Sequence, residues 1–447
     1  MVDFETQYRT RTPASFRLYE EANRYLPSGV AGNGKFMRPY PVYIREAQGS
    51  KVWDADGNQY VDLLMGSGVH ILGHSPRPVV QAVHEQLGHG THLYMPAEYE
   101  VRLAEKICQH MPYIEKVRFV NSGTEATMMA LRAARAYRQR DLIAKFEGNY
   151  HGQHDTVLIS TLGTSGGEEY PSAHIDCVGI PQMVTQDMLI LPFNETDYVA
   201  SKIKEHAEEI GAVIIEPISA FGLGCVAAEM DFLKALREVT AEHDIPLIFD
   251  EVVTNFRLGL GGAGEYFGIK PDLVCLGKII GGGFPVGGYG GRGDIMDKVV
   301  AKTSGVWDLT EQIFQSGTFS GNPISMVAGL AVIEELEKED VYQSLDEKTE
   351  RLKSGIVEMG EEFGFDLLVT GLSSFFQIHF GIDELRNKRD ALREDKTISE
   401  MFHLGLRANG IIANAHPLFL STAHSEEDVQ AILEATGKVL SQMKPSL

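Results

Sequence analysis

Short apolar runs alternate with helix-like segments between about residue 75 and residue 325, and this alternation limits the possible folds more than any other feature. The runs cover residues 117–120, 142–146, 212–215, 247–249 and 273–276. Continuously apolar strands separated by helices are typical of a mostly parallel sheet covered by helices on both faces. Ligands of such sheets bind beyond the carboxyl ends of the strands. We therefore expect an α/β fold with its functional site at that edge.

The two ends of the 447-residue chain have a different pattern. Residues 39–64 contain short strand-like runs, and residues 324–364 form one long helical stretch, followed by strand-like runs at 367–370 and 375–380. A closing helix is expected to begin at Ser425, with Asp428 completing a capping box. We predict three parts: residues 1–64, an N-terminal segment that packs with the small domain; residues 65–325, a large domain that carries the binding site; and residues 326–447, a smaller α/β domain.

Charge and cysteine spacing exclude several classes of partner. The formal net charge of −22 disfavours binding to nucleic acid or to an anionic membrane surface. The four cysteines lie far apart without a Cys-x-x-Cys pair, which predicts free thiols in a reducing cytoplasm and no metal site. The first residues lack the apolar segment of a signal peptide, and no apolar stretch is long enough to span a bilayer. We expect a soluble, cytoplasmic protein with no membrane partner.

Three groups of polar residues follow the apolar runs. Lys278 comes after the run 273–276, where desolvation can turn a lysine into an amine nucleophile, although a solvated lysine fits the same pattern. Ser122, Gly123 and Thr124 follow the run 117–120 and open a helix, where they suit a phosphate or simply cap the helix. Asp250 follows the run 247–249, and a carboxylate there must be paired or reach a cavity.

Five blocks of sequence, taken in order, resemble the class III aminotransferases, which are fold type I enzymes that use pyridoxal 5′-phosphate. The blocks are FVNSGTEA (119–126), KFEGNYHG (145–152), LIFDEV (247–252), LGKIIGGG (276–283) and QSGTFSGNP (315–323). The resemblance extends from about residue 27 to the C-terminus and is greatest to the glutamate-1-semialdehyde aminomutases and their transaminase relatives. It implies a large pyridoxal-phosphate-binding domain with a mostly parallel sheet between helices, together with a smaller α/β domain.

The resemblance also implies roles for individual residues. Lys278 binds the cofactor covalently and moves the proton of the substrate carbon, and Asp250 keeps the ring nitrogen protonated. The remaining contacts implied are with the ring faces (Tyr150, Val252) and with the phosphate (Ser122, Gly123, Thr124 and, from the neighbouring subunit, Thr318). The contact through Thr318 implies a homodimer with a shared active site. We assign no catalytic role to His151.

The chain departs from the aminomutases where the substrate is expected to bind. A motif similar to GGVNSPVR supplies an arginine for the substrate carboxylate in that branch, whereas this chain has SGVAGNGK at 28–35, so that Lys35 replaces the arginine. The FEAGF motif near the C-terminus is also missing from residues 412–420. Many class III aminotransferases pair an arginine of that region with a glutamate that Glu216 resembles. Here the glutamate is present without the arginine, and Lys35 or Arg38 could bind a carboxylate instead.

We therefore predict an intermolecular aminotransferase. Its ping-pong reaction would move an amino group from an amine, an ω-amino acid or a β-amino acid to an oxo acceptor. One alternative is glutamate-1-semialdehyde 2,1-aminomutase or a related pyridoxal-phosphate-dependent isomerase or racemase, which would convert a single substrate without a co-substrate. A second alternative is a non-catalytic relative that serves as a binding or regulatory module, which the presence of Lys278 and Asp250 disfavours.

Overall fold

The computed structural model describes residues 3–162, 171–300 and 308–443. The chain forms two compact units: the first contains residues 1–76, 343–384 and 393–447, and the second contains residues 77–342 and 385–392. The predicted division into residues 1–64, 65–325 and 326–447 stays a prediction.

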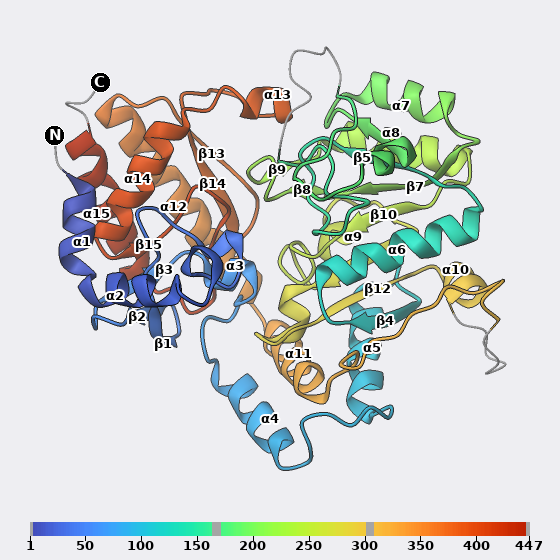
Figure 1. Ribbon diagram of the computed structural model, residues 1–447, viewed down its shortest axis with the longest axis horizontal. Helices are drawn as coiled ribbons and strands as arrows, with labels where there is room; N and C mark the ends of the chain where they lie inside the picture. Colours follow the sequence, from blue (N-terminus) through green and yellow to red (C-terminus); the bar gives the residue numbers. More distant parts are fainter. Residues whose placement is uncertain (1–2, 163–170, 301–307, 444–447) are drawn as a thin grey trace. The chain divides into compact units, whose positions relative to one another are not determined.

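The second unit is built on a seven-stranded sheet with the strand order β4-β12-β11-β10-β7-β5-β6 (Figure 1). The strands are β4 (Lys116–Val120), β5 (Leu142–Phe146), β6 (Met188–Leu191), β7 (Ile210–Ile215), β10 (Leu247–Asp250), β11 (Leu273–Gly277) and β12 (Gly287–Gly291). Strand β12 pairs antiparallel with both of its neighbours, and the other pairings are parallel. The predicted α/β class with a mostly parallel sheet is confirmed, and each of the five apolar runs contributes to a strand.

The sequence analysis did not predict strand β12. Its sequence is GGYGG, and glycine is rare in strands. The glycines are needed because neighbouring backbone lies very close. A Cβ atom on Gly287 would lie 2.1 Å from the carbonyl oxygen of Ser122, and one on Gly290 would lie 2.3 Å from that of Lys116. Because Gly287 has no side chain, this end of β12 can lie against Ser122, in the loop that precedes helix α6.

Helix α6 (Gly123–Arg138) packs across β12, β11 and β7. Small buried residues, among them Ala126, Ala130 and Ala133, let it lie close to the sheet within the core. Further helices of this unit are α4 (Arg77–Leu87), α5 (Glu98–His110), α7 (Thr196–Glu205), α8 (Met230–Glu242), α9 (Gly262–Tyr266), α11 (Pro323–Leu336) and α13 (Lys388–Ala391). Helix α6 therefore begins at the edge of the sheet where ligands are expected.

The first unit joins the beginning and the end of the chain. Its sheets have the orders β1-β2-β3-β15 and β13-β14-β16, and β15 runs parallel to β3. The strands are β1 (Ile44–Gln48), β2 (Lys51–Asp54), β3 (Gln59–Asp62), β13 (Leu367–Thr370), β14 (Phe375–Phe380), β15 (Ile411–Ile412) and β16 (Leu418–Phe419). The main helices are α1 (Phe4–Arg11), α2 (Pro13–Ala22), α12 (Val341–Phe363), α14 (Lys396–Ala408) and α15 (Glu426–Met443).

Two helix predictions had different outcomes. The capping box is confirmed: the Ser425 hydroxyl accepts from the N–H of Asp428 (3.2 Å), whose carboxylate accepts from the N–H of Ser425 (3.0 Å). The prediction of a single long helix over residues 324–364 is wrong. The helix is interrupted between α11 and α12, where Asp340 has a left-handed conformation (φ +62°). None of the helices in the described part of the chain is long and apolar enough to cross a membrane.

Candidate active site

Lys278 lies directly after β11 in a strained backbone conformation. Its φ of +50° is unusual for a residue with a side chain, and such strain concentrates at functional sites. The side chain is half-buried, and its amine makes no hydrogen bond to any residue that the structure describes. Loss of hydration lowers the pKa of this amine, while the carboxylates of Asp250 and Glu216 oppose the effect. The site thus holds an amine with a weakened hold on its proton.

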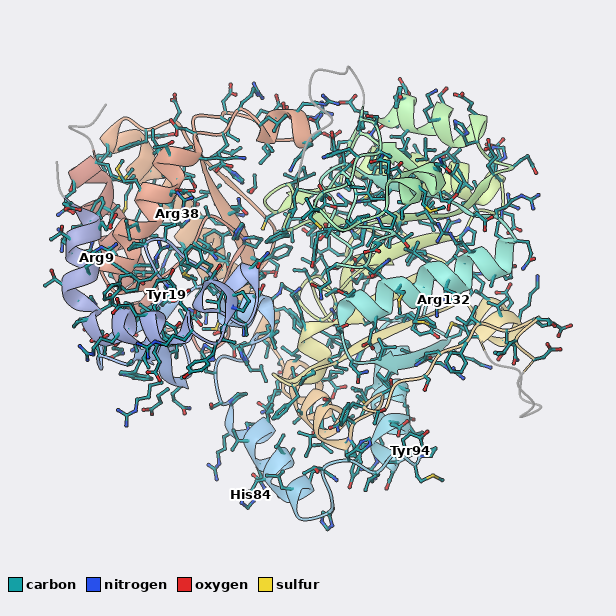
Figure 2. All side chains as sticks on the ribbon, in the orientation of Figure 1. Arg9, Tyr19, Arg38, His84, Tyr94 and Arg132 are labelled. Carbon is teal, nitrogen blue, oxygen red and sulfur yellow. The ribbon has the colours of Figure 1, made fainter. Side chains whose placement is uncertain are left out.

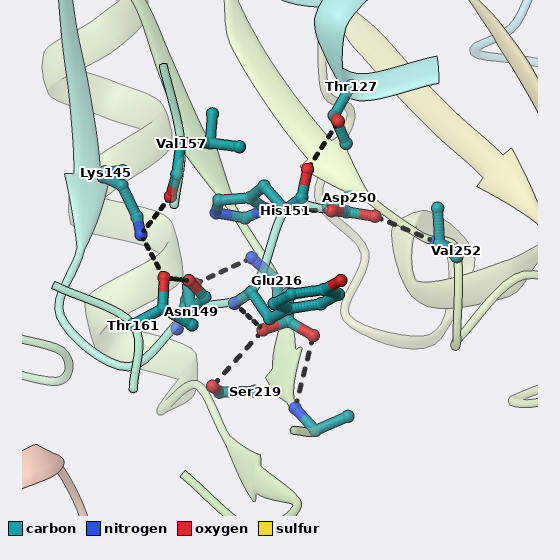
Figure 3. Close-up of polar contacts among 12 residues, drawn as sticks. Thr127, Lys145, Asn149, His151, Val157, Thr161, Glu216, Ser219, Asp250 and Val252 are labelled. Atoms are coloured by element: carbon teal, nitrogen blue, oxygen red, sulfur yellow. Dashed lines mark hydrogen bonds and ion pairs between the residues drawn. The ribbon is translucent and has the colours of Figure 1, made fainter. Parts of the chain in front are cut away.

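Asp250 ends the neighbouring strand β10 and is held in place by two donors. One carboxylate oxygen lies 2.8 Å from Nδ1 of His151, and the other accepts from the N–H of Val252 at 3.1 Å (Figure 3). His151 is completely buried, and burial lowers its pKa although the bond to Asp250 opposes this. A neutral His151 then donates from Nδ1, which leaves the negative charge on Asp250. This pairing was missing from the sequence-based prediction, which gave His151 no catalytic role.

Gly123 and Gly277 allow three chain segments to meet beside Lys278. A Cβ atom on Gly123, in the first turn of α6, would lie 3.0 Å from both methyl groups of Val252. One on Gly277, the residue before Lys278, would lie 3.2 Å from the same side chain. Val252 follows β10, so the start of α6, the end of β10 and the end of β11 converge on it. The sheet edge therefore brings the predicted residues Lys278, Val252 and Gly123 together.

The start of α6 offers an anion site. Ser122 is its N-cap, with the hydroxyl accepting from the N–H of Glu125 at 3.2 Å. The capping interpretation thus accounts for Ser122, but the first N–H groups of a helix lack intrahelical partners and carry the positive end of its dipole. Thr124 accepts from the N–H of Gln153 at 3.3 Å, which ties the helix start to the loop that carries His151. Phosphate contacts by Ser122, Gly123 and Thr124 stay a prediction.

Tyr150 and Glu216 are linked to each other. The N–H of Tyr150 donates to the Glu216 carboxylate at 2.7 Å, and the N–H of Ala220 does so at 3.3 Å. Burial and the neighbouring charge of Asp250 raise the pKa of Glu216 to about 8. The ring of Tyr150 contacts that of Phe221, with the centroids 5.3 Å apart. The stacking role of Tyr150 and the substrate role of Glu216 stay predictions.

The remaining predicted residues are exposed. Thr318 lies on the second unit, between β12 and α11. Lys35 and Arg38 belong to the first unit, where the backbone carbonyl of Arg38 accepts a hydrogen bond from Arg407 at 2.9 Å. Arg407 itself is buried and also donates to the carbonyl of Ala413. Contacts of Lys35 and Arg38 with a substrate, and of Thr318 with a neighbouring subunit, stay predictions.

The geometry fits pyridoxal phosphate. The site combines an amine of lowered pKa on Lys278, a fixed carboxylate on Asp250 and a helix start at Gly123, which match an aldehyde, a ring nitrogen and a phosphate. The predicted contact residues Gly123, Thr124, Tyr150, Val252 and Lys278 are all only half-buried, whereas most residues around them are buried. They therefore keep accessible surface for a ligand.

Known proteins resemble the chain along nearly its whole length. The sequence profile of the family "Aminotransferase class-III" matches residues 34–435. A glutamate-1-semialdehyde 2,1-aminomutase of Methanopyrus kandleri is 42% identical over 439 residues, which cover 98% of this chain and 99% of that protein. One from Methanosarcina acetivorans is 40% identical over 94% of this chain and 97% of its own. In structure, an ω-transaminase from Sphaerobacter thermophilus matches with a TM-score of 0.90 and 37% identity, covering 96% of this chain and 97% of that chain.

The predicted intermolecular aminotransferase is wrong in light of these relatives. The prediction depended on Lys35 replacing an arginine and on the shortened segment 412–420, yet relatives that are 38% to 42% identical over at least 94% of this chain are named aminomutases. A lysine keeps the positive charge of the arginine and can still bind a carboxylate as a point charge, so this substitution does not decide the reaction. The alternative of an aminomutase is the better supported one.

Proposed function

Because the chain belongs to the class III aminotransferase family, whose cofactor is pyridoxal phosphate, we propose that it is a glutamate-1-semialdehyde 2,1-aminomutase. The observation that carries this proposal is the identity of about 40% to proteins of that name, spread over nearly the whole chain. The reaction moves an amino group from C2 to C1 of one molecule. C2 is oxidised to a ketone while the C1 aldehyde is reduced to an aminomethyl group, so the product, 5-amino-4-oxopentanoate, is an isomer and no co-substrate is consumed.

The residues of the site divide the work. When bound, pyridoxal phosphate accepts the electron pair that is released as a C–H bond beside the amino group breaks. The amine of Lys278 removes the proton from that carbon and returns it elsewhere, for which a lowered pKa is suited. Asp250 holds a proton on the ring nitrogen, and His151 fixes the orientation of its carboxylate. The first turn of α6, with Gly123 and Thr124, holds the phosphate.

Binding of the substrate carboxylate requires a cation. Lys35 and Arg38 are the proposed partners, because both are exposed cations: Lys35 stands where the motif has its arginine, and Arg38 follows three residues later. Glu216 is the other proposed substrate contact. Its pKa is raised to about 8, so it takes up a proton more readily than an ordinary glutamate and repels an anionic substrate less. Lys35→Ala and Arg38→Ala should raise the KM for glutamate-1-semialdehyde more than they lower kcat, and equal KM values would exclude these contacts.

A homodimer with a shared active site is proposed as well. Phe319, the residue after Thr318, is 59% exposed, and Tyr94 and Met95 of the same unit are 78% and 70% exposed. The ring of His92 lies 5.0 Å from that of Phe319, which places these residues on one surface of the second unit; Figure 2 labels Tyr94. Apolar surface of this kind favours a protein partner. Mixing Lys278→Ala and Thr318→Ala chains should restore activity at one site per hybrid dimer, whereas a monomer in sedimentation would exclude the proposal.

We also propose a cytoplasmic location. All four cysteines are free thiols, which suits a reducing compartment. Fractionation of the producing cells tests this, and recovery of the protein outside the cytoplasm would contradict it.

A single-substrate assay tests the reaction. The cofactor-loaded protein is mixed with an excess of glutamate-1-semialdehyde and no oxo acid, and 5-amino-4-oxopentanoate is quantified. We expect many turnovers per site, with no dependence on added oxo acid, and none with Lys278→Ala. Conversion that stops after one equivalent per site and resumes on adding an oxo acid would overturn the proposed aminomutase.

A further inference from the structure

A lysine lies inside the buried strand β5. Lys145 is fully buried in the sequence LIAKF, where its neighbours Ala144 and Phe146 are buried as well. Burying an ammonium group is unfavourable unless its protons are hydrogen-bonded. The reaction proposed above gives this lysine no task.

Each proton of the Lys145 ammonium has an acceptor. It donates to the carbonyl oxygens of Val157 (3.1 Å) and Ile159 (2.6 Å) and to the hydroxyl oxygen of Thr161 (2.8 Å). The Thr161 hydroxyl, with its oxygen accepting from Lys145, directs its own proton to the carbonyl of Asn149 at 3.1 Å. Lys145 thus attaches the segment 157–161 to the turn that follows its own strand.

The same turn carries residues of the active site (Figure 3). The side-chain oxygen of Asn149 accepts from the N–H of Glu216 at 2.9 Å, and the Glu216 carboxylate accepts from the N–H of Tyr150 at 2.7 Å. A continuous series of hydrogen bonds therefore leads from Lys145 through Thr161 and Asn149 to Glu216 and Tyr150. Every member except Tyr150 is buried.

We propose that Lys145 is a positioning residue of the cofactor site: through Thr161 and Asn149 it fixes the turn that presents Tyr150, whose N–H in turn holds the carboxylate of Glu216. The inference deepens the proposed function and rests on it for the identity of the reaction, but the position of the turn is a property of the cofactor-free chain as well. Removing the Thr161 hydroxyl removes two adjacent bonds of this series, from Lys145 and to Asn149, while leaving both carbonyl acceptors of Lys145 in place.

Other charges act on the same group. Asp176 holds the N–H groups of Thr161 (2.8 Å) and Leu162 (3.0 Å), and Lys388 donates to the carbonyl of Thr161 at 3.1 Å. The titratable groups that act electrostatically on Lys145 or are acted on by it are Asp176, Glu216, Glu147, Lys388, His151 and His154. None of these groups accepts a hydrogen bond from the Lys145 ammonium. Its position is therefore defined by the three oxygens named above.

Amide hydrogen exchange on cofactor-free protein tests the proposal. Thr161→Val should raise exchange in residues 148–151 and weaken binding of pyridoxal phosphate about 5- to 100-fold, as expected for the two hydrogen bonds that its hydroxyl makes. Lys145→Met should have a larger effect in the same segment. The matched control is Thr240→Val, because Thr240 is equally buried and its hydroxyl donates only within α8, to the carbonyls of Leu236 and Arg237.

Coupling between the two variants gives a second readout. We expect the double variant Lys145→Met/Thr161→Val to bind the cofactor no more weakly than Lys145→Met alone, since both remove the same connection. Additive effects would overturn the proposal, as would exchange in 148–151 that Thr161→Val leaves at the level of the Thr240→Val control. Should Lys145→Met fail to fold, Thr161→Val and its control decide the matter. Exchange is measured without substrate, so a failed aminomutase assay leaves this result unaffected.

Discussion

Replacing Lys145 by methionine should change how the stability of the protein depends on pH. Burial lowers the pKa of Lys145 from its ordinary value of 10.5 to about 7, with Asp176 and Glu216 opposing the shift. Between these two values the unfolded chain binds more protons than the folded chain, so the free energy of unfolding rises with pH. The cost of the buried charge is fully present below about pH 7 and disappears above about pH 10.5.

The size of the effect follows from the two pKa values. Each unit of pKa difference corresponds to about 1.4 kcal/mol, and the partly titrated folded state at pH 7 reduces the slope there. Between pH 7 and pH 9 this one group should add about 2 kcal/mol to the stability of the unmodified protein. Lys145→Met removes the titrating group and leaves the carbonyls of Val157 and Ile159 without this donor, which costs a constant amount at every pH.

Urea unfolding of the cofactor-free protein at pH 7, 8 and 9, at one protein concentration, measures this difference. The gap between the unmodified protein and Lys145→Met should widen by about 2 kcal/mol in favour of the unmodified protein. Lys234→Met is the control, because Lys234 lies on α8 with 58% of its side chain exposed and keeps its hydration. Parallel pH curves for the unmodified protein and Lys145→Met would refute the reasoning, since they would mean that the buried amine titrates as it does in the unfolded chain.

Four further substitutions test the site. Lys278→Ala should abolish covalent cofactor binding, seen as loss of the yellow absorbance, and turnover of glutamate-1-semialdehyde; activity within a few-fold of normal would remove Lys278 from its role. Asp250→Asn should retain the cofactor but lower kcat by at least about 100-fold, because the amide cannot hold the ring nitrogen protonated. His151→Phe should lower kcat in the same way but to a smaller degree. An unchanged kcat in Asp250→Asn would contradict this role of Asp250. Gly123→Ala places a Cβ atom 3.0 Å from the methyl groups of Val252 and should weaken cofactor binding about 10-fold, measured by titration, as expected when a tight contact displaces the phosphate site by a few tenths of an ångström.

The sequence predicted those parts of the fold that depend on apolar patterning. The five apolar runs became strands because a parallel sheet buries both of its faces. Strand β12 was missed because its glycines are required by close contacts with the backbone of Ser122 and Lys116. These contacts exist only in the folded chain and cannot be seen in the sequence. The break before α12 was missed because residues 337–340 contain no glycine or proline, so that nothing in their composition indicated the left-handed conformation of Asp340.

At the site, the sequence located residues that end strands better than residues that support them. Lys278 and Asp250 follow apolar runs, so their positions could be predicted from the edge of the sheet. The pairing of His151 with Asp250 joins residues 99 positions apart and could not be predicted without the fold. Lys145 was not predicted to have a role, although a lysine inside an apolar run must find acceptors and could have been noticed for that reason. Its acceptors, however, come from a loop 12 to 16 positions further along the chain, which no pattern predicted.

The error about the reaction has a chemical basis. The roles proposed for Lys278, Asp250 and the start of α6 concern bond breaking beside the amino group, and that step is common to aminotransferases and aminomutases. The two reactions differ in what happens to the substrate after it has lost its amino group. In an aminotransferase the deaminated molecule leaves the site, whereas in an aminomutase it stays and receives an amino group at its other carbon. Whether the molecule stays depends on the groups that hold its carboxylate. An arginine and a lysine both attract a carboxylate, but arginine binds it through two parallel hydrogen bonds and lysine as a point charge. In the role proposed for Lys35, the choice between lysine and arginine would affect how firmly the skeleton is held, and it would not decide which reaction takes place.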